Sequence, residues 1–172
     1  LAKFSKGGVR INNAAAEAGC LDLCEMAGIP VPERAIEMVA GKTVLLLRRF
    51  DREAAEEDGV RRRHMISSLT ALGAHESDTG MSGYSDLYNA MRRIGNEHGA
   101  GRDIYRRIVM NVLFVNTDDH YRNHAFLLAP NGRYDLSPAY DVTPTLQAST
   151  SRNLFLHLGE AGCGRGATLE AA

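Results

Sequence analysis

The amino-acid sequence predicts an α+β fold, with a strand-rich part up to about Phe50 and a mainly helical part after it. Before Phe50, short apolar runs bounded by glycine and proline are typical of strands, and only one stretch has helical character. Between residues 65 and 115 the apolar residues recur at steps of three and four, as on the buried face of a helix. Short strand signals return after residue 124. This order is typical of a two-layer protein, which we divide into residues 1–50 and 51–172.

Length and composition limit the classes of protein that fit. A chain of 172 residues has the size of one ordinary domain. Its 44% apolar and 24% charged residues are typical of a globular protein. The net charge of −1 gives no general attraction to nucleic acid or to anionic lipid. The longest apolar runs last only a few residues, whereas a membrane span needs about 20.

The cysteines and the start of the chain lead to two further expectations. An odd number of cysteines and no secretory leader favour reduced thiols and a cytoplasmic protein. Cys20 and Cys24 share a face of the predicted first helix, where a buried structural pair is preferred over a metal or redox pair. The sequence opens at Leu1 in what resembles the middle of a strand, so we expect a fragment of a longer protein.

In the first part, Asn12 or Asn13 is expected to cap a helix, because an asparagine side chain accepts hydrogen bonds from the free amides of the first turn. Gly28 ends this helix, and the prolines that follow prevent its resumption. The predicted elements are, in order, a strand end at 1–4, a helix at 14–26 and strands at 34–39 and 43–50.

The second part begins with a charge-rich segment, residues 51–63. Acidic residues precede Gly59 and three arginines follow it, which favours a solvated hairpin with mutually attracting arms over a nucleic-acid site. The elements predicted beyond it are helices at 65–72, 85–94 and 103–115, a hairpin of 124–129 and 133–136, a strand at 153–158 and a glycine-rich loop at 159–166.

The densest polar stretch, which we call the 116–124 loop, lies between the strongest predicted helix and a buried strand. Polar groups between two buried elements have to lie on a loop, where water or a ligand can satisfy them. The loop contains Asp118 and Asn123 in the spacing Asp-x-x-x-x-Asn, which the catalytic loop of protein kinases also uses. Asp141 follows the next predicted hairpin, which can return the chain to the same place.

These residues suit phosphoryl transfer, which needs positioning and charge neutralisation rather than a covalent partner. The carboxylate of Asp118 can accept the proton of the attacking hydroxyl. The amide oxygen of Asn123 and the carboxylate of Asp141 can hold Mg²⁺, which prefers oxygen ligands. Lys3 on a strand and Glu17 on the first helix match the lysine–glutamate pair of kinases.

Five short motifs are spread along most of the chain: Arg-Phe-Asp-Arg at 49–52, His-Met-Ile-Ser at 64–67, Leu-Gly-Ala at 72–74, the 116–124 loop, and Leu-Ser-Pro-Ala-Tyr-Asp-Val at 136–142. In these motifs the sequence resembles the C-terminal kinase region of the HipA family, the serine/threonine kinase toxins of bacterial toxin–antitoxin pairs. The similarity runs from Lys3 to about Leu158. The 116–124 loop followed by Pro-x-Tyr-Asp is its most specific part.

The resemblance implies a protein-kinase-like fold, with a small, strand-rich partial N-lobe at 1–50 and a mainly helical C-lobe at 51–172. It implies that Asp118 is the catalytic base that helps to transfer the γ-phosphate of ATP to a protein serine or threonine. The other implied nucleotide-binding residues are Lys3 and Glu17 at the phosphates, Arg48, Arg49 and Phe50 at the adenine hinge, His120 and Tyr140 beside the nucleotide, and Asn123 and Asp141 as ligands of Mg²⁺.

The resemblance also implies cofactors and partners. ATP and Mg²⁺ are the cofactors, and no membrane contact is expected. Family members form complexes with a small DNA-binding antitoxin of the HipB type, so contact with DNA is indirect. The best-known members phosphorylate an aminoacyl-tRNA synthetase. The glycine-rich phosphate loop expected before Lys3 and the final helices of the family are missing, so the activity of the fragment by itself is a separate question.

Three other interpretations fit part of the sequence. His120 and His124 have the spacing of a zinc pair, although they lie on a predicted loop. Asp118 and Asp119 with Asp141 would serve a two-metal phosphohydrolase, which leaves the lysine–glutamate pair unused; we interpret Asp119 instead as structural support of the loop. Finally, the chain fits a catalytically silent kinase-like module that binds an antitoxin–DNA complex.

Overall fold

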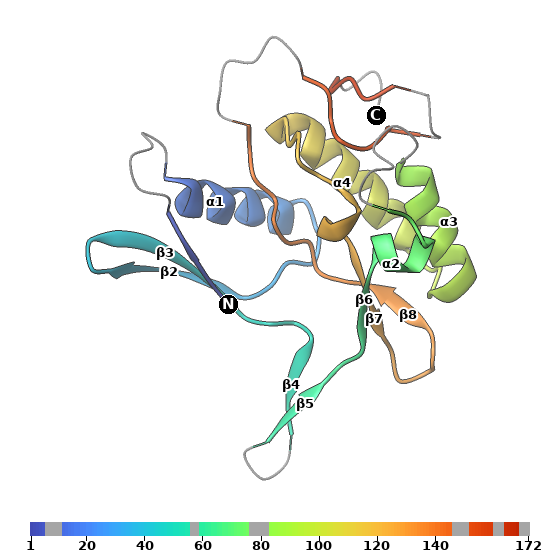
Figure 1. Ribbon diagram of the computed structural model, residues 1–172, viewed down its shortest axis with the longest axis horizontal. Coiled ribbons are helices and arrows are strands. Elements are labelled where there is room, and N and C mark those ends of the chain that lie inside the picture. The colour runs from blue at the N-terminus through green and yellow to red at the C-terminus, as the bar shows by residue number, and fades with distance from the viewer. Residues whose placement is uncertain (6–11, 56–58, 76–82, 146–151, 160–163, 169–172) are drawn as a thin grey trace.

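The computed structural model describes residues 1–5, 12–55, 59–75, 83–145, 152–159 and 164–168. Figure 1 shows a small strand-rich part with one helix on its sheet, beside a mainly helical part that carries a second sheet. The predicted α+β fold is confirmed. Within these ranges, no helix is long and apolar enough to cross a bilayer.

The first part is a three-stranded antiparallel sheet in the order β1-β3-β2, with helix α1 packed against it. Asn12 caps α1 by accepting a hydrogen bond from the amide of Ala15 at 3.1 Å. Leu21 and Cys24 of α1 pack with Leu45 in the core of this part. The elements are β1 (Ala2–Phe4), α1 (Asn13–Met26), β2 (Arg34–Val39) and β3 (Lys42–Leu47).

Both cysteines of α1 are buried free thiols. Burial raises the pKa of Cys20 to about 12 and that of Cys24 to about 11. At neutral pH such thiols are almost wholly protonated, whereas the thiolate is the nucleophile and the metal ligand. These pKa values support the structural interpretation of the pair.

A β-hairpin follows the first part and projects from the body of the protein (Figure 1). It consists of β4 (Arg52–Ala54) and β5 (Val60–Arg62), and residues 56–58 at its tip lie outside the described residues. Glu53 pairs with Arg61 at 2.5 Å across the two strands. The opposite charges therefore attract the two arms of the hairpin to each other, as the sequence predicts.

The helical part carries a second antiparallel sheet, in the order β6-β7-β8. Its core joins Tyr84 and Leu87 of one helix, Ile104 of the next and Phe126 of the central strand. The elements are β6 (Met65–Ser67), α2 (Ser68–Leu72), α3 (Tyr84–Ile94), α4 (Ala100–Phe114), the 3₁₀ turn η1 (Tyr121–Asn123), β7 (Ala125–Leu128) and β8 (Tyr134–Leu136).

Two predicted elements are wrong in part or in whole. Residues 65–67 form strand β6 rather than the first turn of a helix, because β7 offers them an antiparallel partner. The helix begins only after Ser67, whose side chain caps it. Residues 153–158 make isolated bridges and no strand. Leu154 and Leu156 are buried in alternation, which produces a strand-like pattern without a neighbouring strand.

Candidate active site

The 116–124 loop joins α4 to β7, at the end of a buried helix and of a buried strand, as predicted. Nδ2 of Asn123 donates a hydrogen bond to the backbone carbonyl of Asp118 at 2.9 Å and so closes the loop on itself. Asn123 is buried, whereas the side chain of Asp118 is 79% exposed. The loop therefore presents the carboxylate of Asp118 to solvent and keeps the amide of Asn123 inside.

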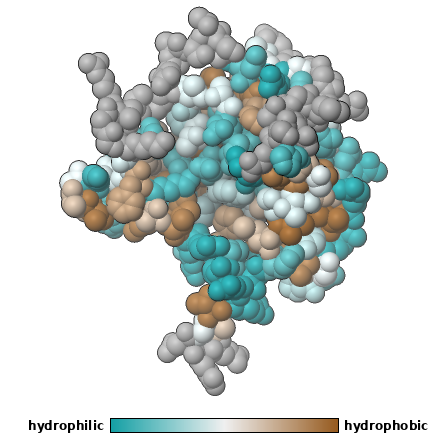
Figure 2. Space-filling view, viewed as in Figure 1, coloured by the Kyte–Doolittle hydropathy of each residue, from teal (hydrophilic) through white to brown (hydrophobic). Residues whose placement is uncertain are grey.

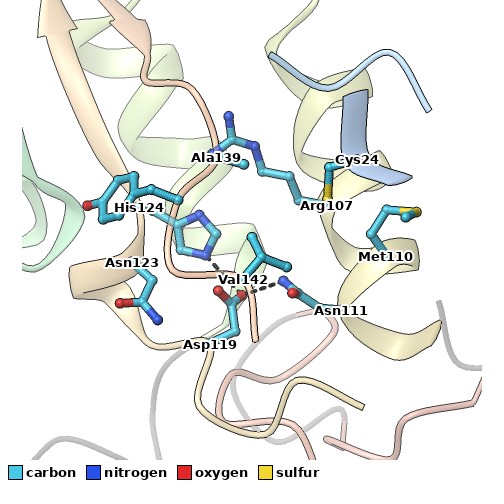
Figure 3. Close-up of a pocket in the computed structure, with 10 residues that line it drawn as sticks. Cys24, Arg107, Met110, Asn111, Asp119, Asn123, His124, Ala139 and Val142 are labelled. Carbon is cyan, nitrogen blue, oxygen red and sulfur yellow. Dashed lines mark hydrogen bonds and ion pairs between the residues drawn. The ribbon is translucent and has the colours of Figure 1, made fainter. Parts of the chain in front are cut away.

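Asp119 anchors this loop to the helices behind it (Figure 3). Its Oδ2 accepts hydrogen bonds from the hydroxyl of Tyr84, from Nδ2 of Asn111 at 2.7 Å and from Nε2 of His124 at 3.0 Å. Burial by itself would raise the pKa of Asp119, but His124, Tyr84 and the charge of Arg107 together lower it below the ordinary value. The carboxylate is therefore ionised and engaged, as expected for a residue that supports the loop.

Lys3 joins three elements that are far apart in the sequence. From β1, its Nζ donates to Oε1 of Glu17 on α1 at 2.7 Å and to Oδ1 of Asp141 at 2.5 Å. Burial opposes the charge of Lys3, but the hydrogen bonds and attraction of Asp141 and Glu17 outweigh burial and raise the pKa of Lys3. Burial and the negative charge of Asp141 raise the pKa of Glu17 against the attraction of Lys3. The expected lysine–glutamate pair is present, and Asp141 joins it.

The 137–142 segment follows β8 and returns the chain to the 116–124 loop. The hydroxyl of Tyr140 donates a hydrogen bond to the backbone carbonyl of Arg122 at 2.6 Å. Burial, and then the charge of Asp141, raise the pKa of Tyr140 to about 12. This hydroxyl therefore stays protonated and keeps its donor role at the contact between segment and loop.

This contact joins the residues directly next to Asn123 and Asp141. Tyr140 and Val142, on either side of Asp141, line the same small cavity as Asn123. Asp141 has a φ of 58°, in the left-handed region that non-glycine residues seldom adopt. Within the described residues, no hydrogen bond reaches Oδ1 of Asn123 or Oδ2 of Asp141. Both oxygens are therefore available to a ligand.

Residues 48–50 leave the sheet, since β3 ends at Leu47 and not at residue 50 as predicted. They line a cavity of about 230 Å³ at the junction of the two parts. The ring centroids of Phe50 and Tyr140 lie 5.5 Å apart, so an aromatic pair borders this cavity. The lining residues are Leu1, Pro32, Leu47, Arg48, Arg49, Phe50, Asp51, Met65 and Tyr140.

The arginines at this junction are tied to carboxylates. Arg48 pairs with Glu33 at 2.9 Å, and Arg49 pairs with Asp51 at 2.7 Å. Asp51 is buried, also accepts a hydrogen bond from Arg52, and has its pKa lowered chiefly by the hydrogen bond from Arg49. Asp51 thus shapes the junction, although the sequence analysis did not select it as a site residue. The Arg-Phe-Asp-Arg motif was the signal that could have identified it.

The two histidines of the loop are engaged with different partners. Nε2 of His124 faces Asp119, whereas the ring of His120 packs edge-on against Phe155 with centroids 5.6 Å apart. Nε2 of His120 lies 4.0 Å from Oδ1 of Asp118. Because the two rings share no partner, the geometry gives no support to a zinc pair. The hydrogen bonds to Asp119 likewise remove one of the three acids that a two-metal site would need.

Three buried polar residues of this region were missed by the sequence analysis. Tyr84, Arg107 and Asn111 come from α3 and α4, and no motif marks them. Their one available signal was the position of Arg107 and Asn111 directly before the core residues Ile108 and Val112 on the predicted helix. A polar side chain on a buried helical face has to find a partner, which is Asp119 of the loop for Tyr84 and Asn111 and the carbonyl of Ser137 for Arg107.

These features define the class of fold to which the protein belongs. In shape it matches HipA in the complex of HipA, HipB and operator DNA from Shewanella oneidensis MR-1, with a TM-score of 0.78, 23% identity, and coverage of 90% of this chain and 39% of that chain. It also matches the proinflammatory kinase CtkA from Helicobacter pylori, with a TM-score of 0.64 and 18% identity. This match covers 86% of this chain and 52% of that chain. The protein has a kinase-like α+β fold.

The family follows from the sequence match. The HipA-like C-terminal domain matches residues 1–168, and the chain belongs to this family. It is 26% identical over 136 residues to the serine/threonine-protein kinase toxin HipA of Shewanella oneidensis, covering 70% of this chain and 31% of that protein. It is 25% identical over 158 residues to a putative kinase of Haemophilus influenzae, covering 83% of this chain and 45% of that protein. The chain thus spans less than half the length of these two relatives.

Proposed function

We propose that the protein is an ATP-dependent serine/threonine protein kinase of the HipA type, with residues 1–50 as a partial N-lobe and residues 51–172 as the C-lobe. The observation that carries this proposal is the contact of Lys3 with both Glu17 and Asp141, the latter 138 residues further along the chain. In protein kinases a strand lysine, a helix glutamate and a metal-binding acid surround the nucleotide phosphates. The same three kinds of group meet here.

Asp118 is the proposed catalytic base. Its exposed carboxylate can be reached by a protein substrate, and the hydrogen bond from Asn123 fixes the backbone that carries it. It would accept the proton of the attacking serine or threonine hydroxyl. Lys3 would donate to the phosphate oxygens, and its raised pKa favours the charged form that this role needs.

Asn123 and Asp141 are the proposed ligands of Mg²⁺. An amide oxygen and a carboxylate are the hard donors that this ion prefers, and each side chain has an oxygen that no described residue binds. Bound Mg²⁺ would neutralise charge on the phosphate oxygens. The contact of Tyr140 with the 116–124 loop supports this assignment, because it joins the residues directly next to the two proposed ligands.

The cavity of about 230 Å³ at the junction of the two parts is the proposed adenine site. Phe50 and Tyr140 offer aromatic surface to the base, and Arg48 and Arg49 also line the cavity. His120, which lies near Asp118 in the loop, would flank the nucleotide. The aromatic surface suits a planar, uncharged ring such as adenine better than it suits a charged phosphate group.

In the cell, the proposed kinase is the toxin of a toxin–antitoxin pair and acts in the cytoplasm on a protein such as an aminoacyl-tRNA synthetase. The likeness to HipA in a complex with HipB and operator DNA supports a small DNA-binding antitoxin of the HipB type as its partner. Contact with DNA would then be made through the antitoxin, in agreement with a net charge of −1.

The test uses the full-length gene product. Asp118→Asn should abolish transfer of the γ-phosphate to protein while the affinity for ATP stays near the wild-type value. Asp141→Ala should weaken the binding of ATP only when Mg²⁺ is present. Substantial transfer by the Asp118→Asn variant would refute the base assignment, and an unchanged response to Mg²⁺ in the Asp141→Ala variant would refute the ligand assignment.

A catalytically silent module is separated from a kinase by nucleotide binding. A ligand that binds only the folded state stabilises it by mass action. ATP with Mg²⁺ should therefore raise the thermal midpoint of the wild-type protein in proportion to the logarithm of nucleotide concentration. A midpoint that does not move would favour the silent module.

A further inference from the structure

Arg107 of α4 is a fully buried cation whose hydrogen bonds are incomplete. Its Nη2 donates to the backbone carbonyl of Ser137, the first residue of the 137–142 segment. Its Nε and Nη1 are buried and have no partner among the described residues. A buried charged group with unmet donors is unfavourable, so buried arginines are normally surrounded by acceptors or by ordered water.

His124, which lines the same small cavity as Arg107, also has a buried polar atom without a partner among the described residues. Its Nε2 bonds to the carboxylate of Asp119, while its Nδ1 is buried without a partner in the described part of the chain. In Figure 3 the imidazole of His124 lies between the guanidinium group of Arg107 and the carboxylate of Asp119. Whether Nδ1 donates or accepts depends on the tautomer of the ring, and in either case this nitrogen lacks a partner among the described residues. Arg107 thus lacks acceptors, and Nδ1 of His124 lacks a hydrogen-bond partner of either kind, within this part of the chain.

The cavity that both residues line has a volume of about 10 Å³. This is close to the lower limit of space that can hold one water molecule, and such a water needs at least two polar partners. Arg107 and Asp119 already balance one another in charge, so a neutral occupant fits better than an ion. Water can accept from Arg107 and also pair with Nδ1 of His124, because it both donates and accepts hydrogen bonds, whereas an apolar occupant can do neither.

We infer that this cavity holds one water molecule between Arg107 and Nδ1 of His124, and that Arg107 is a positioning residue that ties the 137–142 segment to the 116–124 loop. One side of its guanidinium group holds Ser137, and the other side reaches the loop through water. The consequence rests on the proposed function: together with the contact between Tyr140 and Arg122, Arg107 fixes the spacing of Asn123 and Asp141, the two proposed Mg²⁺ ligands.

The first test does not depend on kinase activity. A crystal structure of the protein, at a resolution that shows ordered water, should contain density within hydrogen-bond distance of both Arg107 and Nδ1 of His124. An empty cavity would overturn the inference. So would a guanidinium group that bonds only to protein atoms.

The second test compares Arg107→Met with Arg106→Met, the same change one residue earlier on α4. Arg106 donates to the carbonyl of Gly28, away from the loop, and serves as the control. ATP binding is measured by calorimetry with and without Mg²⁺. Arg107→Met should lower the Mg²⁺ affinity of the ATP-bound protein about 10–100-fold, as for other residues that support metal ligands, and leave metal-free ATP binding unchanged. Arg106→Met should leave both unchanged.

A purely structural role predicts a different result, namely equal losses of ATP affinity with and without Mg²⁺, and that result would overturn the inference. If Arg107→Met fails to fold, Arg107→Lys replaces it, because lysine keeps the charge and one bond to Ser137 but cannot also reach the water. The lysine variant should show a smaller loss that is again specific to Mg²⁺. If the wild-type protein binds no ATP at all, the proposed function fails, and the crystal structure still decides whether the water is present.

Discussion

Replacing each of the adjacent residues Asp118 and Asp119 with alanine should separate stability from chemistry. Asp119→Ala removes the shared acceptor of Tyr84, Asn111 and His124, and also a negative charge near buried Arg107. Removing one partner of a buried charged network costs about 3–5 kcal/mol. This is a large fraction of the roughly 5–15 kcal/mol by which proteins are stable. The variant should therefore be only marginally folded.

The side chain of Asp118 is 79% exposed and makes no hydrogen bond in the described structure, so its loss should change the free energy of unfolding by less than about 0.5 kcal/mol. For a chain of this size, about 1 kcal/mol corresponds to roughly 2–4 °C in the thermal midpoint. The Asp119→Ala midpoint should then fall by about 6–20 °C, while the Asp118→Ala midpoint stays within about 2 °C of wild type.

Urea unfolding followed by far-ultraviolet circular dichroism measures both variants on the same scale. A shift of the midpoint at constant slope reports stability alone. Equal unfolding free energies for Asp118→Ala and Asp119→Ala would refute the view that Asp119 is the buried anchor of the loop. A large loss in the Asp118→Ala variant would show that its exposed position is misassigned.

The remaining predictions concern backbone space and pH. A Cβ at Gly95 would lie 2.5 Å from Cε of Met91 and 2.8 Å from the carbonyl of Tyr134, so Gly95→Ala should cost about 1–3 kcal/mol in urea unfolding. Gly19→Ala lies in the middle of α1, and apart from its chain neighbours and the backbone of its own helix no atom of the described residues lies within 4 Å of the new Cβ, so it should instead stabilise by about 0.5–1 kcal/mol. Matching results for the two glycines would contradict the packing. The pKa of Asp51 lies below its ordinary value of 3.8, chiefly because of the hydrogen bond from Arg49. The stability that this bond supplies is fully present above that value and is lost as the pH falls through the folded-state pKa. Urea midpoints measured from neutral to acidic pH should therefore fall less steeply for Asp51→Asn than for wild type, and identical slopes would count against the assignment.

Much of the architecture was predictable because its causes are local. The cap at Asn12 and the apolar spacing of α4 depend on residues within a few positions of each other. The Glu53–Arg61 attraction likewise acts within one hairpin. The failures at residues 48–50, 65–67 and 153–158 concern strands, and a strand exists only where another segment offers it a partner. No local pattern contains that information.

The sequence by itself was enough to select the groups to which we assign chemistry, since Asp118, Asn123 and Asp141 stand out in the polar loop and after the hairpin that follows it. Only the tertiary structure decided how they are held. Asp141 meets Lys3 across most of the chain, and Arg107 reaches the 137–142 segment from the face of a helix. Hydrogen bonds act over about 3 Å in space, whatever the distance along the chain, so these contacts appear only when the packed elements are known.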